Sequence, residues 1–226
     1  MTLAAFQDVF AAWPSLLNGL MMTVTLTLIS SFLGVGLGTL CAWGSLRAPR
    51  WLRWIIRSYV EFFRNTPFLG QIFFVFFGLP TLGLRMDSFT AAIVALTINL
   101  TAYACEIIRA GIEATPRGQY EAAGALGLKP AHAFFLVIIP PAFQRVWPAM
   151  TSQLVIILLA SALCSQISVA ELSYAANVIA SRTFRNFEAY IVVTILYLFL
   201  AILFREMLVW MGRRFLFGNF AAAGRA

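Results

Sequence analysis

Residues 16–43 read LLNGLMMTVTLTLISSFLGVGLGTLCAW, a stretch without a single charged side chain. A helix that crosses the hydrocarbon core of a bilayer needs about 20 predominantly apolar residues, each adding roughly 1.5 Å. The stretch is therefore predicted to be a membrane-spanning helix. The residues before it, 2–12, are expected to form a short amphipathic segment, because Pro14, Asn18 and Gly19 punctuate the beginning of the charge-free region.

The composition of the whole chain extends this interpretation. Hydrophobic residues make up 61% of the chain and charged residues 11%, against about 45–50% and about 25% in soluble domains. Four further apolar stretches are predicted to span the membrane: 65–84, 88–108, 147–168 and 189–211. We therefore expect an all-α integral membrane protein with five transmembrane helices, forming a single transmembrane domain over residues 1–226.

The distribution of basic residues predicts the orientation. Five spans place the two termini on opposite sides, and loops rich in Lys and Arg face the cytoplasm. One side holds Arg47, Arg50, Arg53, Arg57, Arg109, Arg117, Lys129, Arg145, Arg213, Arg214 and Arg225, and the other Arg85, Arg182 and Arg185. The N-terminus is therefore expected outside and the C-terminus in the cytoplasm. These arginines flank spans rather than forming one basic face, which argues against nucleic-acid binding despite the net charge of +7.

The longest polar connection, residues 111–145, has internal organisation. A first helix is predicted over 115–126, ended by Gly127 in the left-handed conformation. A second helix is predicted to begin at Pro130 and to stop before the proline pair at 140–141, because proline in a helix interior removes a hydrogen bond and clashes with the preceding turn.

This loop carries a recognisable pattern, Glu121-Ala122-Ala123 followed by Gly127 and Pro140. It resembles the EAA loop of ABC-importer permeases. The resemblance implies that these five residues couple the chain to a separate ATPase dimer, which binds ATP and Mg in the cytoplasm. Small side chains let a partner approach the backbone, and Glu121 offers a charge to a basic surface. The alternative is an amphipathic helix that rests on the lipid surface.

Other segments resemble the polar-amino-acid permeases of the same superfamily. They are Glu61–Gln71, Ala102–Gln119 and Val169–Leu172. The resemblance implies a type I ABC-importer fold in the bacterial inner membrane, a second permease subunit, identical or paralogous, and a periplasmic or lipid-anchored solute-binding protein. The family's polar K-[DN]-[ST]-S-L segment is replaced here by Leu159–Leu163, so acidic, basic and neutral amino acids all remain open as substrates.

The sequence contains no candidate for covalent chemistry. Lys129, the only lysine, precedes a proline, so the chain has no phosphate-binding loop, and ATP hydrolysis is expected in a partner. His132 is the only histidine, and no metal-ligand pattern is present. Cys41, Cys105 and Cys164 lie in predicted spans and are interpreted as small buried hydrophobic residues. We therefore expect no metal or cofactor in this chain.

A polar pathway through the membrane must be built from side chains that face the interior of the bundle. Asn99, Tyr103 and Glu106 are spaced four and three apart on one helix face, and Arg109 continues near it. Arg109 and Glu106 together offer a donor for the carboxylate of an amino acid and an acceptor for its ammonium group. Alternatively, these two residues pair with each other and with Glu113. Further candidates are Thr66, Gln71, Ser161 and Gln166.

Two other functions were considered. A gradient-driven secondary transporter or channel for small polar solutes would need no ATPase, but such folds usually show internal repeats, and none is visible here. A membrane enzyme is disfavoured by the lack of a nucleophile or metal-ligand cluster.

Overall fold

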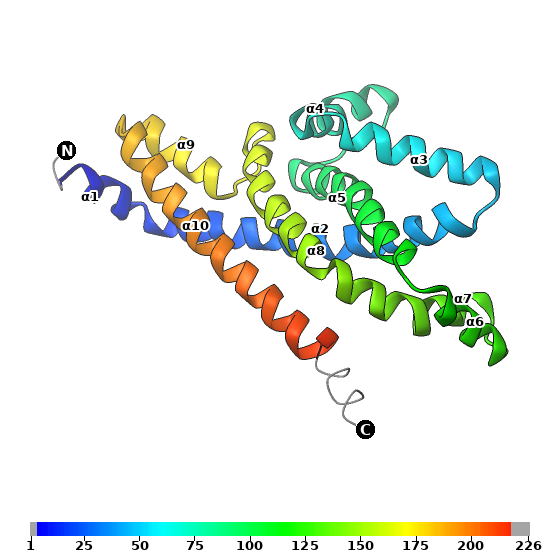
Figure 1. Cartoon of the computed structure of the whole chain (residues 1–226). Helices are drawn as coiled ribbons and strands as arrows, with labels where there is room; N and C mark the ends of the chain where they lie inside the picture. The colour runs from blue at the N-terminus through cyan, green and yellow to red at the C-terminus, as the bar shows by residue number, and fades with distance from the viewer. Residues whose placement is uncertain (1–3, 218–226) are drawn as a thin grey trace.

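The computed structural model describes residues 4–217, and all regular structure in that part of the chain is helical (Figure 1). The predicted all-α fold is confirmed. The elements are α1 (Ala4–Ala11), α2 (Trp13–Arg47), α3 (Arg50–Arg64), α4 (Phe68–Phe73), η1 (Phe74–Gly78), η2 (Leu79–Leu82), α5 (Ser88–Glu113), α6 (Arg117–Ala125), α7 (Pro130–His132), η3 (Ala133–Ile138), α8 (Ile139–Ala160), η4 (Ser161–Ile167), α9 (Leu172–Thr183), α10 (Asn186–Met211) and η5 (Gly212–Phe217). Arg225 lies outside the described residues.

Four helical stretches in the described part are long and apolar enough to cross a membrane: 13–47, 88–113, 130–167 and 186–215. A fifth candidate is a pair of helices, Arg50–Arg64 and Phe68–Leu82, between which the chain bends by 109°. The stretch 65–84, expected as one span, therefore forms only one arm of this pair and the break before it. Helix α3 carries charges along one face, so it does not appear in the sequence as a charge-free stretch.

The long helices pack closely because small residues lie between them. Helix α2 packs along α5, and a Cβ atom added at Gly38 would lie 2.6 Å from the Cβ of Ala104. At Gly34 an added Cβ would lie 2.8 Å from the side chain of Leu100. Glycine at these positions therefore sets the distance between the two helices.

The polar loop differs from its prediction at one point. The first helix, α6, is followed by Gly127 with a φ of 67°, in the left-handed conformation that was expected. The second begins at Pro130 as expected, but the prediction that it stops before residues 140–141 is wrong, because helical structure continues through η3 into α8. Both prolines lie near the start of α8, after a π turn, where missing N–H groups cost little.

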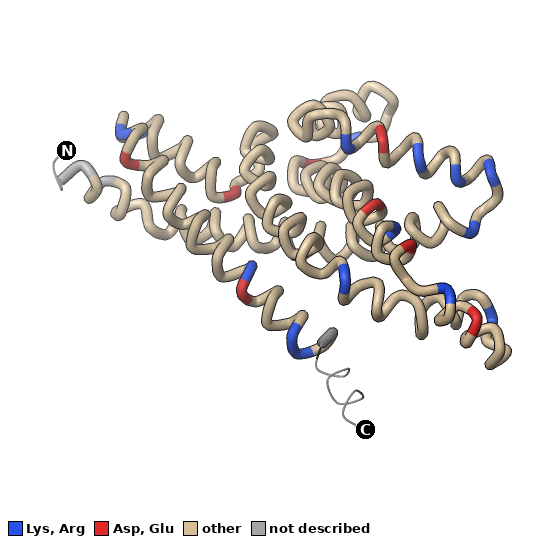
Figure 2. The backbone as a smooth tube through the Cα atoms, viewed as in Figure 1, with Lys and Arg blue, Asp and Glu red and all other residues tan. Residues whose placement is uncertain are grey.

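Basic residues gather toward the end of the bundle that carries α6 and the loop between α2 and α3 (Figure 2). The start of α10 and the end of α9 lie at the opposite end of the bundle (Figure 1). Between η4 and α9, the chain reverses through Ser168, which has a φ of 64°, and brings Glu171 against α2 and α10.

Candidate functional site

A cavity of about 590 Å³ lies between α3 and α5, next to the C-terminal end of α2. Its size falls within the range typical of small-molecule sites, roughly 300–1,000 Å³. Its lining is dominated by charged side chains from two helices: Arg50, Arg53, Arg57, Glu61 and Arg64 from α3, and Glu106, Arg109 and Glu113 from α5.

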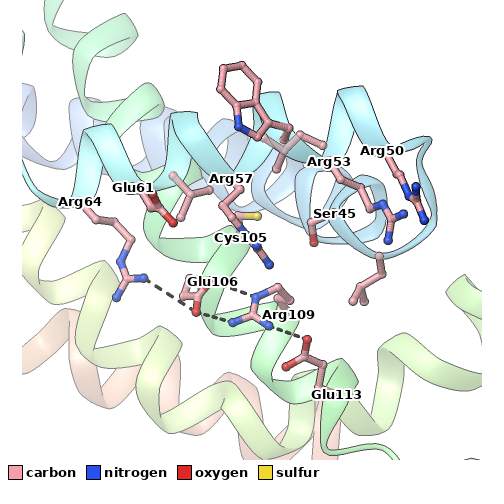
Figure 3. A pocket seen from close by; sticks show the side chains of 14 residues that line it. Ser45, Arg50, Arg53, Arg57, Glu61, Arg64, Cys105, Glu106, Arg109 and Glu113 are labelled. Atoms are coloured by element: carbon pink, nitrogen blue, oxygen red, sulfur yellow. Dashed lines mark hydrogen bonds and ion pairs between the residues drawn. The ribbon is translucent and has the colours of Figure 1, made fainter.

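The spacing of the charges on α3 explains why they face this cavity. Positions 50, 53, 57, 61 and 64 are three or four residues apart, so they lie on one face of a helix. Figure 3 shows these side chains along the side of α3 that faces α5. Trp51 and Phe62, which lie outside this lining, are 64% and 60% exposed. In a membrane these apolar side chains suit lipid, while the charged side chains line the cavity.

Ion pairs occupy part of the cavity wall (Figure 3). Arg109 donates from Nη2 to Glu106 Oε1 at 2.6 Å and from Nε to Glu106 Oε2 at 3.0 Å, and it also pairs with Glu113. Arg64 Nη1 lies 3.9 Å from Glu106 Oε1. The mutual pairing considered as an alternative is thus present in this structure, and substrate binding by Glu106 and Arg109 stays a prediction.

Three of the predicted pathway residues meet at the bend between α3 and α4. Gln71 Nε2 donates to Phe63 O at 2.8 Å and to Thr66 Oγ1 at 2.9 Å. Asn99 Nδ2 on α5 donates to Gln71 Oε1 at 2.8 Å, and both amide side chains are buried. These amide groups hydrogen-bond to each other and to the backbone, so they hold the bend between α3 and α4 against α5.

The remaining predicted residues are dispersed. The Tyr103 hydroxyl donates to Arg64 O at 3.4 Å, and the Arg64 guanidinium lies 5.7 Å from the centre of the Tyr103 ring. Ser161, in η4, is fully buried and donates to Leu158 O at 2.6 Å, whereas Gln166 is exposed. None of these three lines the cavity with Glu106 and Arg109.

The residues of the EAA pattern lie in and around α6. Glu121 and Ala122 are exposed, while Ala123 is buried where α6 packs on η3. Gly127 ends this segment, and Pro140 is partly buried near the start of α8. Helix α6 therefore presents a surface of small side chains beside the Glu121 carboxylate.

One buried carboxylate was given no role by the sequence analysis. Glu171 is 0% exposed and accepts a hydrogen bond from the backbone N of Tyr174 at 2.8 Å and another from the hydroxyl of Tyr197. The hydroxyl of Thr23 lies 3.5 Å from its Oε2 and accepts from Leu172 N at 3.2 Å. Burial raises the pKa of the Glu171 carboxyl, and the hydrogen bond from Tyr197 opposes that rise.

Signals for the missed residues were present in the sequence. Glu171 is the only charged residue between Arg145 and Arg182, and an isolated charge in such a stretch indicates a special environment. Arg50, Arg53 and Arg57 were used only to predict orientation, although the three-and-four spacing of the charges on α3 predicts a charged helix face. In the described residues, no three His, Cys, Asp or Glu side chains are grouped so that they could hold a metal ion.

Comparison with known proteins places this architecture in a family. Residues 34–216 match the family described as binding-protein-dependent transport system inner membrane component. The L-cystine transport system permease protein TcyB of Bacillus subtilis is 37% identical over 75% of this chain and 73% of its own length. The arginine transport system permease protein ArtQ of the same organism is 35% identical over 84% of this chain and 87% of its own length.

Solved structures agree with these relatives. A chain from the crystal structure of an amino acid ABC transporter with histidines is 37% identical, with a TM-score of 0.83, over 95% of this chain and 100% of that one. A chain of the MetNI methionine ABC transporter, 22% identical with a TM-score of 0.75, shares the fold over 88% of this chain and 95% of its own. The predicted resemblance to amino-acid ABC permeases is confirmed. The chain belongs to the family of binding-protein-dependent transport system inner membrane components and is a multi-pass ABC permease subunit of the inner membrane.

Proposed function

We propose that this chain forms the pathway by which a polar amino acid is imported, driven by ATP hydrolysis in a partner ATPase. The observation that carries the proposal is the cavity between α3 and α5, lined by arginines and glutamates. An amino acid is a zwitterion, so a pathway for it needs donors for the carboxylate and an acceptor for the ammonium group. The relatives named for cystine and arginine transport support the substrate class.

The proposed assembly contains two permease subunits, identical or paralogous, an ATPase dimer that binds ATP and Mg, and a solute-binding protein on the outer side. The N-terminus is placed outside and the C-terminus inside, following the basic loops. Exposed Glu121 and Ala122 on α6 support a contact between this loop and the ATPase. The chain itself would contribute the pathway and the coupling surface, and ATP would supply the free energy.

The test is uptake by the complete transporter in proteoliposomes. Glu121→Lys should lower ATP-dependent uptake at least about tenfold, since a reversed charge at the contact costs on the order of 1–3 kcal/mol. Membrane insertion should be unchanged. Glu188→Lys, at a partly exposed position in the first turn of α10 on the opposite end of the bundle, is the control and should bind the ATPase normally.

Two results would refute the proposal. Normal uptake by the Glu121→Lys variant would remove α6 from the coupling mechanism. Uptake by the purified chain alone, without ATP or an ATPase, would instead indicate a gradient-driven transporter. For the pathway itself, Arg109→Ala should abolish the stimulation of ATP hydrolysis by substrate, and an unchanged stimulation would indicate that Arg109 only pairs with Glu106 and Glu113.

A further inference from the structure

The charges of the cavity between α3 and α5 are not balanced. Arg64 and Arg109 contact Glu106 and Glu113, and this set of four carries no net charge. Of the other lining residues, Arg50, Arg53, Arg57 and Glu61 form no ion pair within the described part of the chain. Three arginines and one glutamate are thus left to interact with whatever enters the cavity.

The charges of the α3 side chains without an ion-pair partner can be compared with the charges of an amino acid. The ammonium group of an amino acid needs one carboxylate, and Glu61 is available for it. Its α-carboxylate needs one of the three free arginines. Two arginines then remain next to the ligand without a counter-charge, which favours a second carboxylate and disfavours a cationic side chain.

We infer that this cavity admits an amino acid with an anionic side chain, and that Arg53 and Arg57 determine this specificity. The inference rests on the proposed function and narrows its substrate class, which the sequence left open. Both arginines project from α3 toward the cavity, as Figure 3 shows. Both side chains are exposed and line the cavity, so their positive charge acts on a ligand that enters it.

Orientation alone does not explain this placement. Arginines that only mark the cytoplasmic side of a span can point to lipid head groups or water. Here, Trp51 and Phe62 lie outside the cavity lining, whereas Arg50, Arg53 and Arg57 are part of it. The helix is amphipathic with its charged side turned toward α5, which is the arrangement expected of a pathway wall.

The experiment measures ATP-dependent uptake by the complete transporter with its ATPase and binding protein, using labelled L-glutamate, L-aspartate, L-glutamine and L-arginine in turn. An acidic amino acid should be the transported substrate. The variant Arg53→Gln with Arg57→Gln should lower its maximal uptake rate roughly tenfold, from the loss of two charges beside the ligand. Arg53→Lys with Arg57→Lys, which keeps both charges, should retain most of the uptake.

A matched control removes two arginines outside the cavity. Arg85→Gln with Arg182→Gln changes the net charge by the same amount at exposed positions and should leave uptake near the wild-type rate. Basal ATP hydrolysis and assembly with the ATPase are measured for every variant, and the Arg85→Gln, Arg182→Gln control should match the wild type in both. Substrate binding to the separate binding protein is unaffected by any of them, so a lower rate reports on the permease.

The outcomes separate this inference from the proposed function. Uptake of arginine or of glutamine alone, or full uptake of an acidic amino acid by the Arg53→Gln, Arg57→Gln variant, overturns the inference and leaves amino-acid import standing. Equal loss in the lysine variant and the glutamine variant also overturns it, because charge would then not be the cause. Absence of ATP-dependent uptake of every amino acid in the panel refutes the proposed function itself.

Discussion

The surroundings of Glu171 differ from the cavity between α3 and α5 in how they accommodate charged side chains. Glu171 is 0% exposed, and its hydrogen-bond donors, the Tyr174 backbone and the Tyr197 hydroxyl, are neutral. In the cavity, Glu106 and Arg109 are each about a third exposed and form an ion pair with each other, while Arg50, Arg53 and Arg57 form no ion pair in the described chain. The hydrogen bonds of Glu171 link α2, α9 and α10, whereas the cavity leaves charged side chains available to a ligand.

The largest effect should come from removing the carboxyl that joins α2, α9 and α10. Glu171→Ala leaves the Tyr174 N–H and the Tyr197 hydroxyl without their acceptor inside the bundle, and should cost about 2–4 kcal/mol of stability. Thermal unfolding of the purified complex in nanodiscs measures this. Glu61→Ala, which removes an exposed carboxyl on α3, is the control and should change stability by less than about 0.5 kcal/mol. Equal effects would remove the distinction between the two regions.

The next effect concerns the close approach of α2 to the start of α9. A Cβ added at Gly19 would lie 2.9 Å from the Cα of Leu172 and 3.0 Å from the Glu171 carbonyl oxygen, and backbone cannot move aside as a side chain can. Gly19→Ala should therefore destabilise the chain by about 1–3 kcal/mol. Gly36→Ala on the same helix, where an added Cβ meets nothing within 4 Å, should be neutral or slightly stabilising. A neutral Gly19→Ala would show that α9 is not held tightly.

A smaller effect is expected at the bend between α3 and α4. Gln71→Leu leaves Asn99 Nδ2 without its acceptor and frees the Phe63 carbonyl, so it should cost about 1–2 kcal/mol, near the upper end for side-chain hydrogen bonds within membranes. Substrate-stimulated ATP hydrolysis should also fall, because α3 carries the cavity's charges. The measurement pairs thermal unfolding with hydrolysis, and Thr81→Val, at an exposed hydroxyl beyond the bend, is the control. Unchanged substrate-stimulated hydrolysis would show that the hydrogen bonds at the bend do not affect the function of the cavity.

The smallest effect is a dependence on pH. Burial raises the pKa of Glu171, so the folded chain binds that proton more tightly than the unfolded chain does. Its contribution to stability is therefore greatest below the ordinary carboxyl pKa and declines as pH rises through the raised value. Glu171→Gln has no ionisation to lose and should be relatively more stable at the alkaline end. Parallel unfolding curves of both proteins at every pH would contradict the raised pKa.

The sequence predicted those features that depend on composition and local pattern. The all-α fold, the left-handed Gly127 and the family resemblance followed from apolar stretches, a helix-ending signal and motif spacing. The bend at residues 65–67 did not, because a charge-free stretch was equated with a span. A helix with charges on one face can also lie in a membrane when that face lines a cavity.

The candidate site was predicted only in part, for a related reason. Spacing along one helix identified Asn99, Glu106 and Arg109, but the partners that each meets come from other helices. Gln71 binds Asn99 across 28 positions of sequence, and Tyr197 binds Glu171 across 26. Such pairings depend on how helices are arranged in space, which periodicity within a single segment does not report.

The continuous helical segment from Pro130 to Ile167 can transmit movement from one end of the bundle to the other. It covers 38 residues without leaving helical structure, hence roughly 57 Å at about 1.5 Å per residue. A column of that length that turns about its lower end by about 5° displaces its tip by about 5 Å. Because the proline pair at 140–141 does not interrupt it, a force applied beside α6 would be transmitted along this path toward η4, and the places on the path that bend most readily are the π turn η3 and Pro148 inside α8.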